Sequence, residues 1–351
     1  MKKKSRATWL LAVLAMFALL MAACGDDGGD DSSSGSGDSG SLSGSIKISG
    51  SSTVEPISAL AREEFIAENG DVDISVDGPG TGDGFALFCD GETDISDASR
   101  AIDEEEVATC EKNGIEFIEL RIAIDGLSVI TAEDDELECL NFADLYALIG
   151  PESEGFENWS DAQTLAEELG SDTKMPDQNL VITAPGEESG TYDSFIEIAL
   201  SDIAEARVEE GKIKEDVAET TRADYSASPD DNAIIEGVAG DSGGLGWVGF
   251  AFADQAEGVK LMPVASAPGE KCVAPSAETI QDGSYPIARP LYIYVNKAKA
   301  AANESLTAFV DYYLESLTDL VEASDYIPLA DDAETLAAWT DKTAGAQEAG
   351  G

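Results

Sequence analysis

Residues 46–65 read IKISGSSTVEPISALAREEF, and this stretch decides the fold. Ile46 and Ile48 alternate with polar residues, which predicts a short strand, and the apolar residues at 57, 60, 61 and 65 have the spacing of a helix. Between the two elements lies Gly50-Ser51-Ser52-Thr53, which places hydroxyl side chains at the start of the helix. Free backbone N–H groups and the positive end of the helix dipole meet at such a point, where a protein can hold an oxyanion without a metal.

The same arrangement occurs twice more along the chain. A strand pattern over 72–76 leads into Gly78-Pro79-Gly80-Thr81-Gly82-Asp83-Gly84, and the strand-like segment 180–184 leads to Glu188-Ser189-Gly190-Thr191. Any one of these segments, taken alone, is better explained by a Ser or Thr that caps a helix. Three of them in one chain, each at the carboxyl end of a strand where open sheets bind ligands, predict a cage for a tetrahedral anion.

The rest of the chain also alternates between strand and helix patterns, which predicts an α/β fold. Segments 115–120 and 122–132 read as strands, the second crossing between two domains, and 243–252 reads as a buried strand. A strand over 290–296 is expected to return to the first domain, which the helices after Leu306 close. We therefore expect a first domain of residues 46–131 and 285–351 and a second domain of residues 132–284.

The N-terminus has the pattern of an export signal. Basic residues at positions 2, 3, 4 and 6 precede the apolar run 9–23, which is shorter than the roughly 20 residues of a membrane span. We expect a signal peptide over 1–23. Small residues before Cys24 resemble a bacterial lipobox, so Cys24 is predicted to be lipidated, with ordinary signal cleavage as the alternative. Residues 24–45 are rich in Gly, Ser and Asp and are expected to act as a tether, holding the protein at the outer face of the cell membrane.

The composition excludes several functions. With 71 Asp and Glu against 20 Lys and Arg, the net charge is −51, so the chain has no basic patch for a nucleic acid. We interpret this acidity as an adaptation to a saline medium, where charges are screened. The chain has no histidine, which excludes a Ser-His-Asp triad and a zinc site that contains histidine. We therefore predict a binding protein without metal or cofactor rather than an enzyme.

Four cysteines remain after Cys24. An even number in an exported protein predicts two disulfides. We prefer Cys89 with Cys110 and Cys139 with Cys272, because each bridge then stays within one predicted domain. Four free, buried thiols are the alternative.

Three charged residues are candidates for the anion site. Arg100 follows Ser99 after a predicted strand, and arginine is the natural bidentate partner of an oxyanion, although a surface ion pair would explain it as well. Asp125 and Asp97 are candidates to accept a hydrogen bond from the P–OH group of monohydrogen phosphate, a donor that sulfate lacks. Asp125 is the first choice, and solvated surface charge is the alternative for both.

The order of these motifs resembles the PstS family, the phosphate-binding lipoproteins of Pst-type ABC importers. The resemblance is carried by Gly-Ser-Ser-Thr-Val-Glu-Pro at 50–56, Gly-Thr-Gly-Asp-Gly-Phe at 80–85, Asp-Ile-Ser-Asp-Ala-Ser-Arg at 94–100, Ile-Asp-Gly-Leu-Ser-Val at 124–129 and Ser-Gly-Thr at 189–191. It implies a type II periplasmic-binding-protein fold, in which two α/β domains joined by two crossing strands bind inorganic phosphate between them. We also expect a monomer that delivers phosphate to the membrane permease of an ABC importer.

The resemblance also assigns phosphate contacts. They fall on residues of the three loops: Ser52, Thr53, Val54, Thr81, Ser189, Gly190 and Thr191. Two positions depart from the family pattern, since Pro185 stands where many members have an arginine and Ser99 stands near the place of an aspartate. We predict that Ser99 and Arg100 complete the site and that Arg100 replaces the missing cationic contact.

Other functions remain open at this point. The nearest are a binding protein for another oxyanion, such as sulfate or molybdate, and an envelope phosphate sensor. An envelope phosphohydrolase and an adhesive surface lipoprotein are more distant alternatives.

Overall fold

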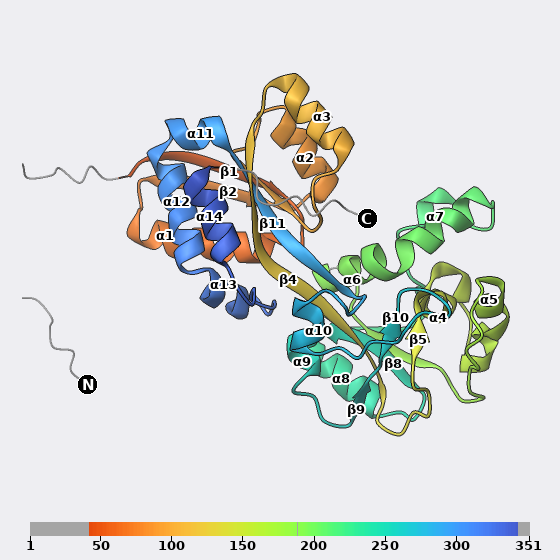
Figure 1. The fold of residues 1–351 in the computed structure, drawn as a ribbon. Helices are drawn as coiled ribbons and strands as arrows, with labels where there is room; N and C mark the ends of the chain where they lie inside the picture. Colours follow the sequence, from red (N-terminus) through yellow and green to blue (C-terminus); the bar gives the residue numbers. More distant parts are fainter. Residues whose placement is uncertain (1–41, 188, 343–351) are drawn as a thin grey trace, which may run out of the picture. The chain divides into compact units, whose positions relative to one another are not determined.

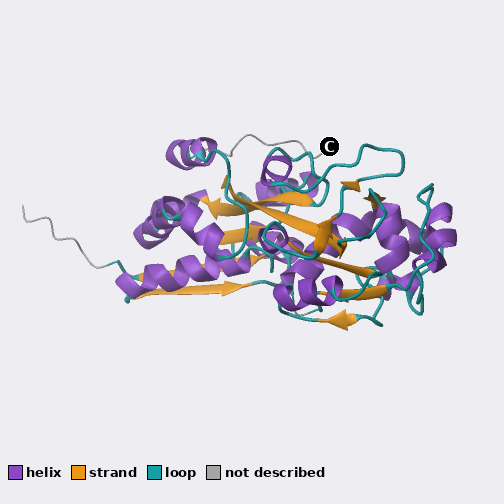
Figure 2. Ribbon diagram, turned by 90° about the horizontal axis from the view of Figure 1, so that it is seen from below, coloured by secondary structure: helices purple, strands orange, loops and turns teal. Residues whose placement is uncertain are grey.

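The computed structural model describes residues 42–187 and 189–342. The predicted signal peptide, Cys24 and all but the end of the tether lie outside these residues. Within them, strands and helices alternate, and the predicted α/β class is confirmed. Figure 2 shows helices on either side of the strands.

The first lobe is built around three parallel strands. In chain order its elements are β1 (Gly44–Gly50), α1 (Glu55–Glu68), β2 (Val72–Asp77), α2 (Thr81–Cys89), β3 (Ile95–Ala98) and α3 (Glu104–Asn113). Strand β1 lies between β2 and β3, and Ile48 is in register with both Val76 and Ile95. Because parallel strands end at the same edge of a sheet, the loops after all three strands lie close together.

Two long strands connect this lobe to the next. Strand β4 (Phe117–Ala132) is one 16-residue strand where the sequence predicted two, and β11 (Ala288–Asn296) is antiparallel to it, as the two strands side by side in Figure 1 show. Their register shifts between Leu291 and Tyr292. The first part of β4 pairs with β11, whereas the part from Leu127 pairs with the strands of the second lobe. These are the predicted crossing strands.

The second lobe holds the middle of the chain. Its strands are β5 (Leu140–Asn141), β6 (Val181–Ala184), β7 (Ser226–Ala227), β8 (Gly244–Gly249), β9 (Val259–Leu261) and β10 (Val264–Ala265). Its α-helices are α4 (Phe142–Ile149), α5 (Gln163–Glu168), α6 (Gly190–Phe195), α7 (Ser201–Glu209), α8 (Asp231–Ala239), α9 (Phe250–Ala253) and α10 (Ala277–Gln281), and single turns lie at Pro151–Ser153, Trp159–Ala162, Ile196–Leu200 and Glu215–Val217. The predicted strand over 243–252 therefore ends early, since Phe250 begins a short helix.

The C-terminal helices return to the first lobe. They are α11 (Lys297–Ala302), α12 (Glu304–Glu315), α13 (Leu317–Ala323) and α14 (Ala333–Asp341). Their apolar residues, among them Phe309 and Leu320, share a buried cluster with Ile48 of β1 and Ile57 of α1. A separate cluster around Trp159 and Trp247 forms the core of the second lobe. The main sheet runs β2-β1-β3-β11-β4-β8-β6-β7, so both lobes contribute to one sheet through β11 and β4.

Both disulfides join residues within one lobe. Cys89 is bonded to Cys110, which links α2 to α3, and Cys139 is bonded to Cys272. The preferred pairing is confirmed. None of the helices in the described residues combines the length and the apolar character needed to cross a membrane.

Candidate anion-binding site

The first loop follows β1 directly. Gly50 has φ +152°, and a Cβ at this position would lie 2.0 Å from the carbonyl oxygen of Asp97, so the turn requires glycine. The N–H of Ser51 donates to that carbonyl at 2.9 Å. The N-cap of α1 is Val54, which supplies no capping side chain, and the hydroxyl of Ser51 accepts the N–H of Thr53 at 3.2 Å in the turn just before the helix.

The second loop packs against the first. The N–H of Gly80 donates to the carbonyl of Gly50 at 2.9 Å, and a Cβ on Gly84 would lie 2.4 Å from the Cα of Gly50. The hydroxyl of Thr81 lies 3.0 Å from the hydroxyl of Ser99 and accepts the N–H of Ser99 at 3.1 Å. The predicted residues after β1, β2 and β3 are therefore brought together.

The third loop reaches the first loop from the second lobe. A Cβ on Gly190 would lie 3.9 Å from the Cα of Thr53. The hydroxyl of Thr53 is 3.2 Å from that of Ser194, and the hydroxyl of Ser52 donates to Asp193 at 3.3 Å. Ser189 makes the same local contact as Ser51, because its hydroxyl accepts the N–H of Thr191 at 3.2 Å and caps α6.

The cation at this meeting point is Arg289, which the sequence analysis did not single out. Its Nη2 donates to Ser194 at 2.8 Å and to Thr53 at 3.2 Å, and thus joins a hydroxyl from each lobe. Its Nη1 donates to Glu197. Arg289 belongs to β11 and lies opposite Asp125 of β4, with Nε 3.5 Å from Oδ2 of that carboxylate.

Arg100 lies elsewhere. Its guanidinium makes two hydrogen bonds to Glu106, at 2.7 and 2.8 Å, and its side chain is 45 % exposed. Glu106 is held in place by the capping box that it forms with Asp103 at the start of α3. In the structure Arg100 thus forms the surface ion pair that was its alternative explanation.

The two candidate carboxylates occupy different surroundings. Asp125 is 2 % exposed and lies beside Arg289. Burial raises its pKa, and the guanidinium of Arg289 opposes that shift. The Asp97 carboxylate instead accepts a hydrogen bond from Ser58 at 3.0 Å on the α1 side of β3, and burial raises its pKa to about 7. Only the backbone carbonyl of Asp97 supports the first loop.

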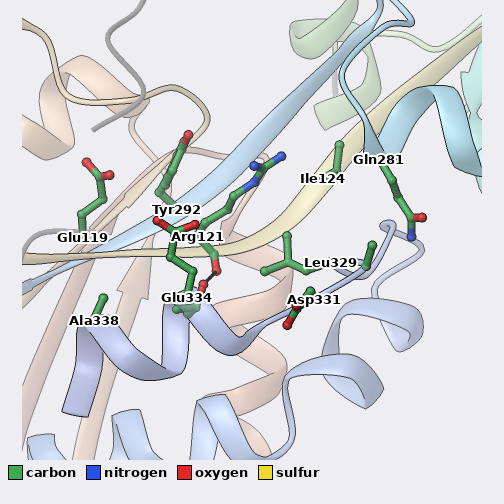
Figure 3. A pocket seen from close by; sticks show the side chains of 11 residues that line it. Glu119, Arg121, Ile124, Gln281, Tyr292, Leu329, Asp331, Glu334 and Ala338 are labelled. Carbon is green, nitrogen blue, oxygen red and sulfur yellow. Dashed lines mark hydrogen bonds between the residues drawn. The ribbon is translucent and has the colours of Figure 1, made fainter. Parts of the chain in front are cut away.

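Two cavities lie near the crossing strands. One, of about 460 Å³, borders the site because Asp125 and Thr191 line it together with Asp231, Phe252 and Tyr326. The other, of about 210 Å³, lies between β4, β11 and α14, and Figure 3 shows Arg121, Glu119 and Glu334 in its wall. No predicted site residue lines this second cavity. In the part of the chain that the structure describes, no group of three or more Cys, Asp or Glu side chains is arranged to hold a metal ion.

Comparisons with known proteins agree with this architecture. The PBP superfamily domain matches residues 35–316. Protein SphX of Synechococcus elongatus is 36 % identical over 295 residues, covering 83 % of this chain and 80 % of SphX. The phosphate-binding protein PstS of Staphylococcus saprophyticus is 33 % identical over 317 residues, covering 89 % of this chain and 86 % of that protein. The crystal structure of a possible phosphate binding protein from Planctomyces limnophilus superimposes with a TM-score of 0.74 at 33 % identity, covering 86 % of this chain and 99 % of that one.

The chain belongs to the PBP superfamily and, within it, to the family of the phosphate-binding protein PstS. The predicted resemblance is confirmed, and so is the predicted fold of two α/β domains joined by crossing strands.

Proposed function

We propose that this protein is an extracytoplasmic solute-binding protein that captures inorganic phosphate between its two lobes and delivers it to an ABC permease. Relatives named as phosphate-binding proteins support phosphate as the ligand. One observation about this chain carries the proposal: the guanidinium of Arg289 hydrogen-bonds a hydroxyl from each lobe, beside a buried carboxylate.

Each group at this point has a use in holding phosphate. Arg289 and the hydroxyls of Thr53 and Ser194 supply charged and neutral donors to the anion. We assign the other contacts to Ser52, Val54, Thr81 and Ser99 in the first lobe and to Ser189, Gly190 and Thr191 in the second. Enclosure between the lobes excludes water, which strengthens each hydrogen bond to the charged ligand. Arg289 thereby takes the role that the sequence analysis gave to Arg100.

Asp125 supplies selectivity in this proposal. An ionised carboxylate accepts the hydrogen bond of the P–OH group of monohydrogen phosphate, whereas it repels sulfate, which has no such proton. Its position opposite Arg289 in the β4–β11 pair brings this acceptor to the same point as the donors. Asp97 is the weaker candidate, because its carboxylate is engaged by Ser58.

The remaining parts of the proposal concern the whole chain. We propose lobes of residues 46–131 with 285–351 and of residues 132–284. We also propose that a signal peptide over 1–23 is removed, that lipid on Cys24 anchors a monomer to the cell membrane, and that residues 24–45 act as the tether. The protein on this view binds and does not catalyse.

The test compares two arginines by calorimetric titration with phosphate. Charge-assisted hydrogen bonds are worth about 1.5–3 kcal/mol, so Arg289→Ala should weaken phosphate binding tenfold or more. Arg100→Ala is the matched control and should bind as the wild type does. Sulfate should compete weakly. Equal affinity of the wild type and Arg289→Ala, or stronger binding of sulfate or molybdate than of phosphate, would overturn the proposal.

A further inference from the structure

The two terminal nitrogens of the Arg289 guanidinium contact different kinds of partner: hydroxyl groups and a carboxylate. Nη2 donates to Ser194 and Thr53, whereas Nη1 forms an ion pair with Glu197. The Arg289 side chain is 13 % exposed and that of Glu197 is 54 % exposed. Glu197 is therefore the partner open to solvent: its carboxylate can leave the guanidinium and become hydrated, while Asp125 stays beside Arg289.

The helix geometry brings Glu197 to this position. Helix α6 is followed by a π-helical turn over Ile196–Leu200 before α7 begins. Such turns widen a helix locally and are frequent at functional sites. Ser194 and Glu197 are three residues apart across this junction, so both side chains reach the same guanidinium.

The charges around Arg289 are unbalanced. Asp125, Asp193 and Glu197 supply three carboxylates for one guanidinium. Burial raises the pKa of both Asp125 and Asp193, and the charge of Glu197 adds to each shift. A divalent anion that entered with Glu197 in place would meet this negative charge directly.

Building on the proposed phosphate site, we propose that Glu197 is an internal counter-anion that phosphate must displace from Arg289. Phosphate and the Glu197 carboxylate compete for the N–H groups of Nη1. Because Glu197 belongs to the same chain, its carboxylate is present at high effective concentration beside Arg289. An anion that binds Arg289 no better than one carboxylate therefore cannot displace it. A dianion with several acceptor oxygens gains enough to replace it. Glu197 thereby lowers the affinity for phosphate, because part of the favourable interaction of phosphate with Arg289 is offset by the loss of the Arg289–Glu197 ion pair.

The experiment removes the competing charge and keeps the shape of the side chain. In Glu197→Gln the competing side chain is neutral, so the affinity for phosphate should rise on the order of tenfold. The reason is that phosphate binds only those molecules in which Glu197 has left Arg289, and the apparent affinity falls with the fraction of such molecules in the free protein. Glu205→Gln, at an exposed position of α7, changes the net charge equally and should stay within about twofold of the wild type. Thermal unfolding of each variant checks that the fold is intact.

A double-variant cycle isolates the mechanism. If Glu197 acts through Arg289, Glu197→Gln should have no effect on affinity in the Arg289→Ala background. The inference is overturned if Glu197→Gln binds phosphate no more tightly than the wild type, or if it gains equally in both backgrounds. Either result leaves the proposed function standing, provided that the wild type binds phosphate and Arg289→Ala binds it weakly. Failure of the wild type to bind phosphate would instead reject the proposed function itself.

Discussion

Asp97 should make the free energy of unfolding depend on pH between about pH 4 and pH 7. Its side chain is fully buried, and burial raises its pKa from an ordinary value of 3.8 to about 7. The folded protein therefore holds this proton more tightly than the unfolded chain does. As pH rises from about 4 to about 7, the unfolded chain loses the proton first, so the free energy of unfolding falls.

Asp97→Asn should remove this component. Since one pKa unit corresponds to about 1.4 kcal/mol, the variant should be more stable than the wild type at pH 8 by on the order of 4 kcal/mol and nearly equal to it at pH 4. Urea denaturation over this pH range measures the difference. Asp73→Asn, at an exposed position of β2, is the control and should keep the wild-type slope. Parallel curves for Asp97→Asn and the wild type would contradict the prediction.

The two arginines show how far single residues could be predicted. Arg100 was chosen because it follows a site motif, yet the capping box of α3 places Glu106 within its reach, and that contact is local in sequence. Arg289 lies 236 residues from Thr53 and just outside the predicted strand over 290–296. The pairing of β11 with β4 brings it to the site, and the register of that pair, which shifts between Leu291 and Tyr292, does not follow from the pattern of either strand alone.

At the scale of elements, the contact between the first two loops depends on Gly84 of α2. A side chain there would meet the backbone of Gly50 and Ser49, which cannot move without displacing the end of β1. Gly84→Ala should destabilise the protein by about 1–3 kcal/mol and weaken phosphate binding. Gly82→Ala is the matched control on the same helix, because a Cβ there has no neighbour within 4 Å. Unfolding curves and calorimetry of both variants test this, and equal behaviour of the two would contradict it.

The spacing of apolar residues predicts most of the helices and strands, and the exceptions have physical causes. The strands over 46–48 and 72–76 and the helix over 57–65 were predictable because one face of each is buried. Strand β4 was predicted as two strands divided at Arg121, whereas it runs continuously through the register shift at that place, with Ala123 opposite Leu291 and Arg121 opposite Tyr292. The π-helical turn over Ile196–Leu200 was likewise not predictable from the spacing of apolar residues.

At the scale of the whole molecule, the net charge of −51 should make stability depend on salt. By itself, Arg207 pairs with Glu152, Glu168 and Glu210. With 71 acidic side chains for 20 basic ones, most carboxylates have no cation to pair with. Their mutual repulsion disfavours the compact state. The Debye length falls from about 30 Å at 0.01 M salt to about 3 Å at 1 M, so added salt should relieve this repulsion.

The melting temperature should therefore rise steadily between dilute buffer and about 1 M NaCl. KCl should act as NaCl does, because screening depends on ionic strength, whereas sucrose at the same molar concentration should not reproduce the steep part of the rise below about 0.2 M. The Arg289 contacts to Thr53 and Ser194 are partly buried and lie within hydrogen-bond distance, so salt should change phosphate affinity less than it changes the melting temperature. Calorimetric melting in each solute tests the first expectation, and phosphate titration across the same salt range tests the second. A melting temperature independent of salt would show that the acidic surface does not limit the stability of this protein.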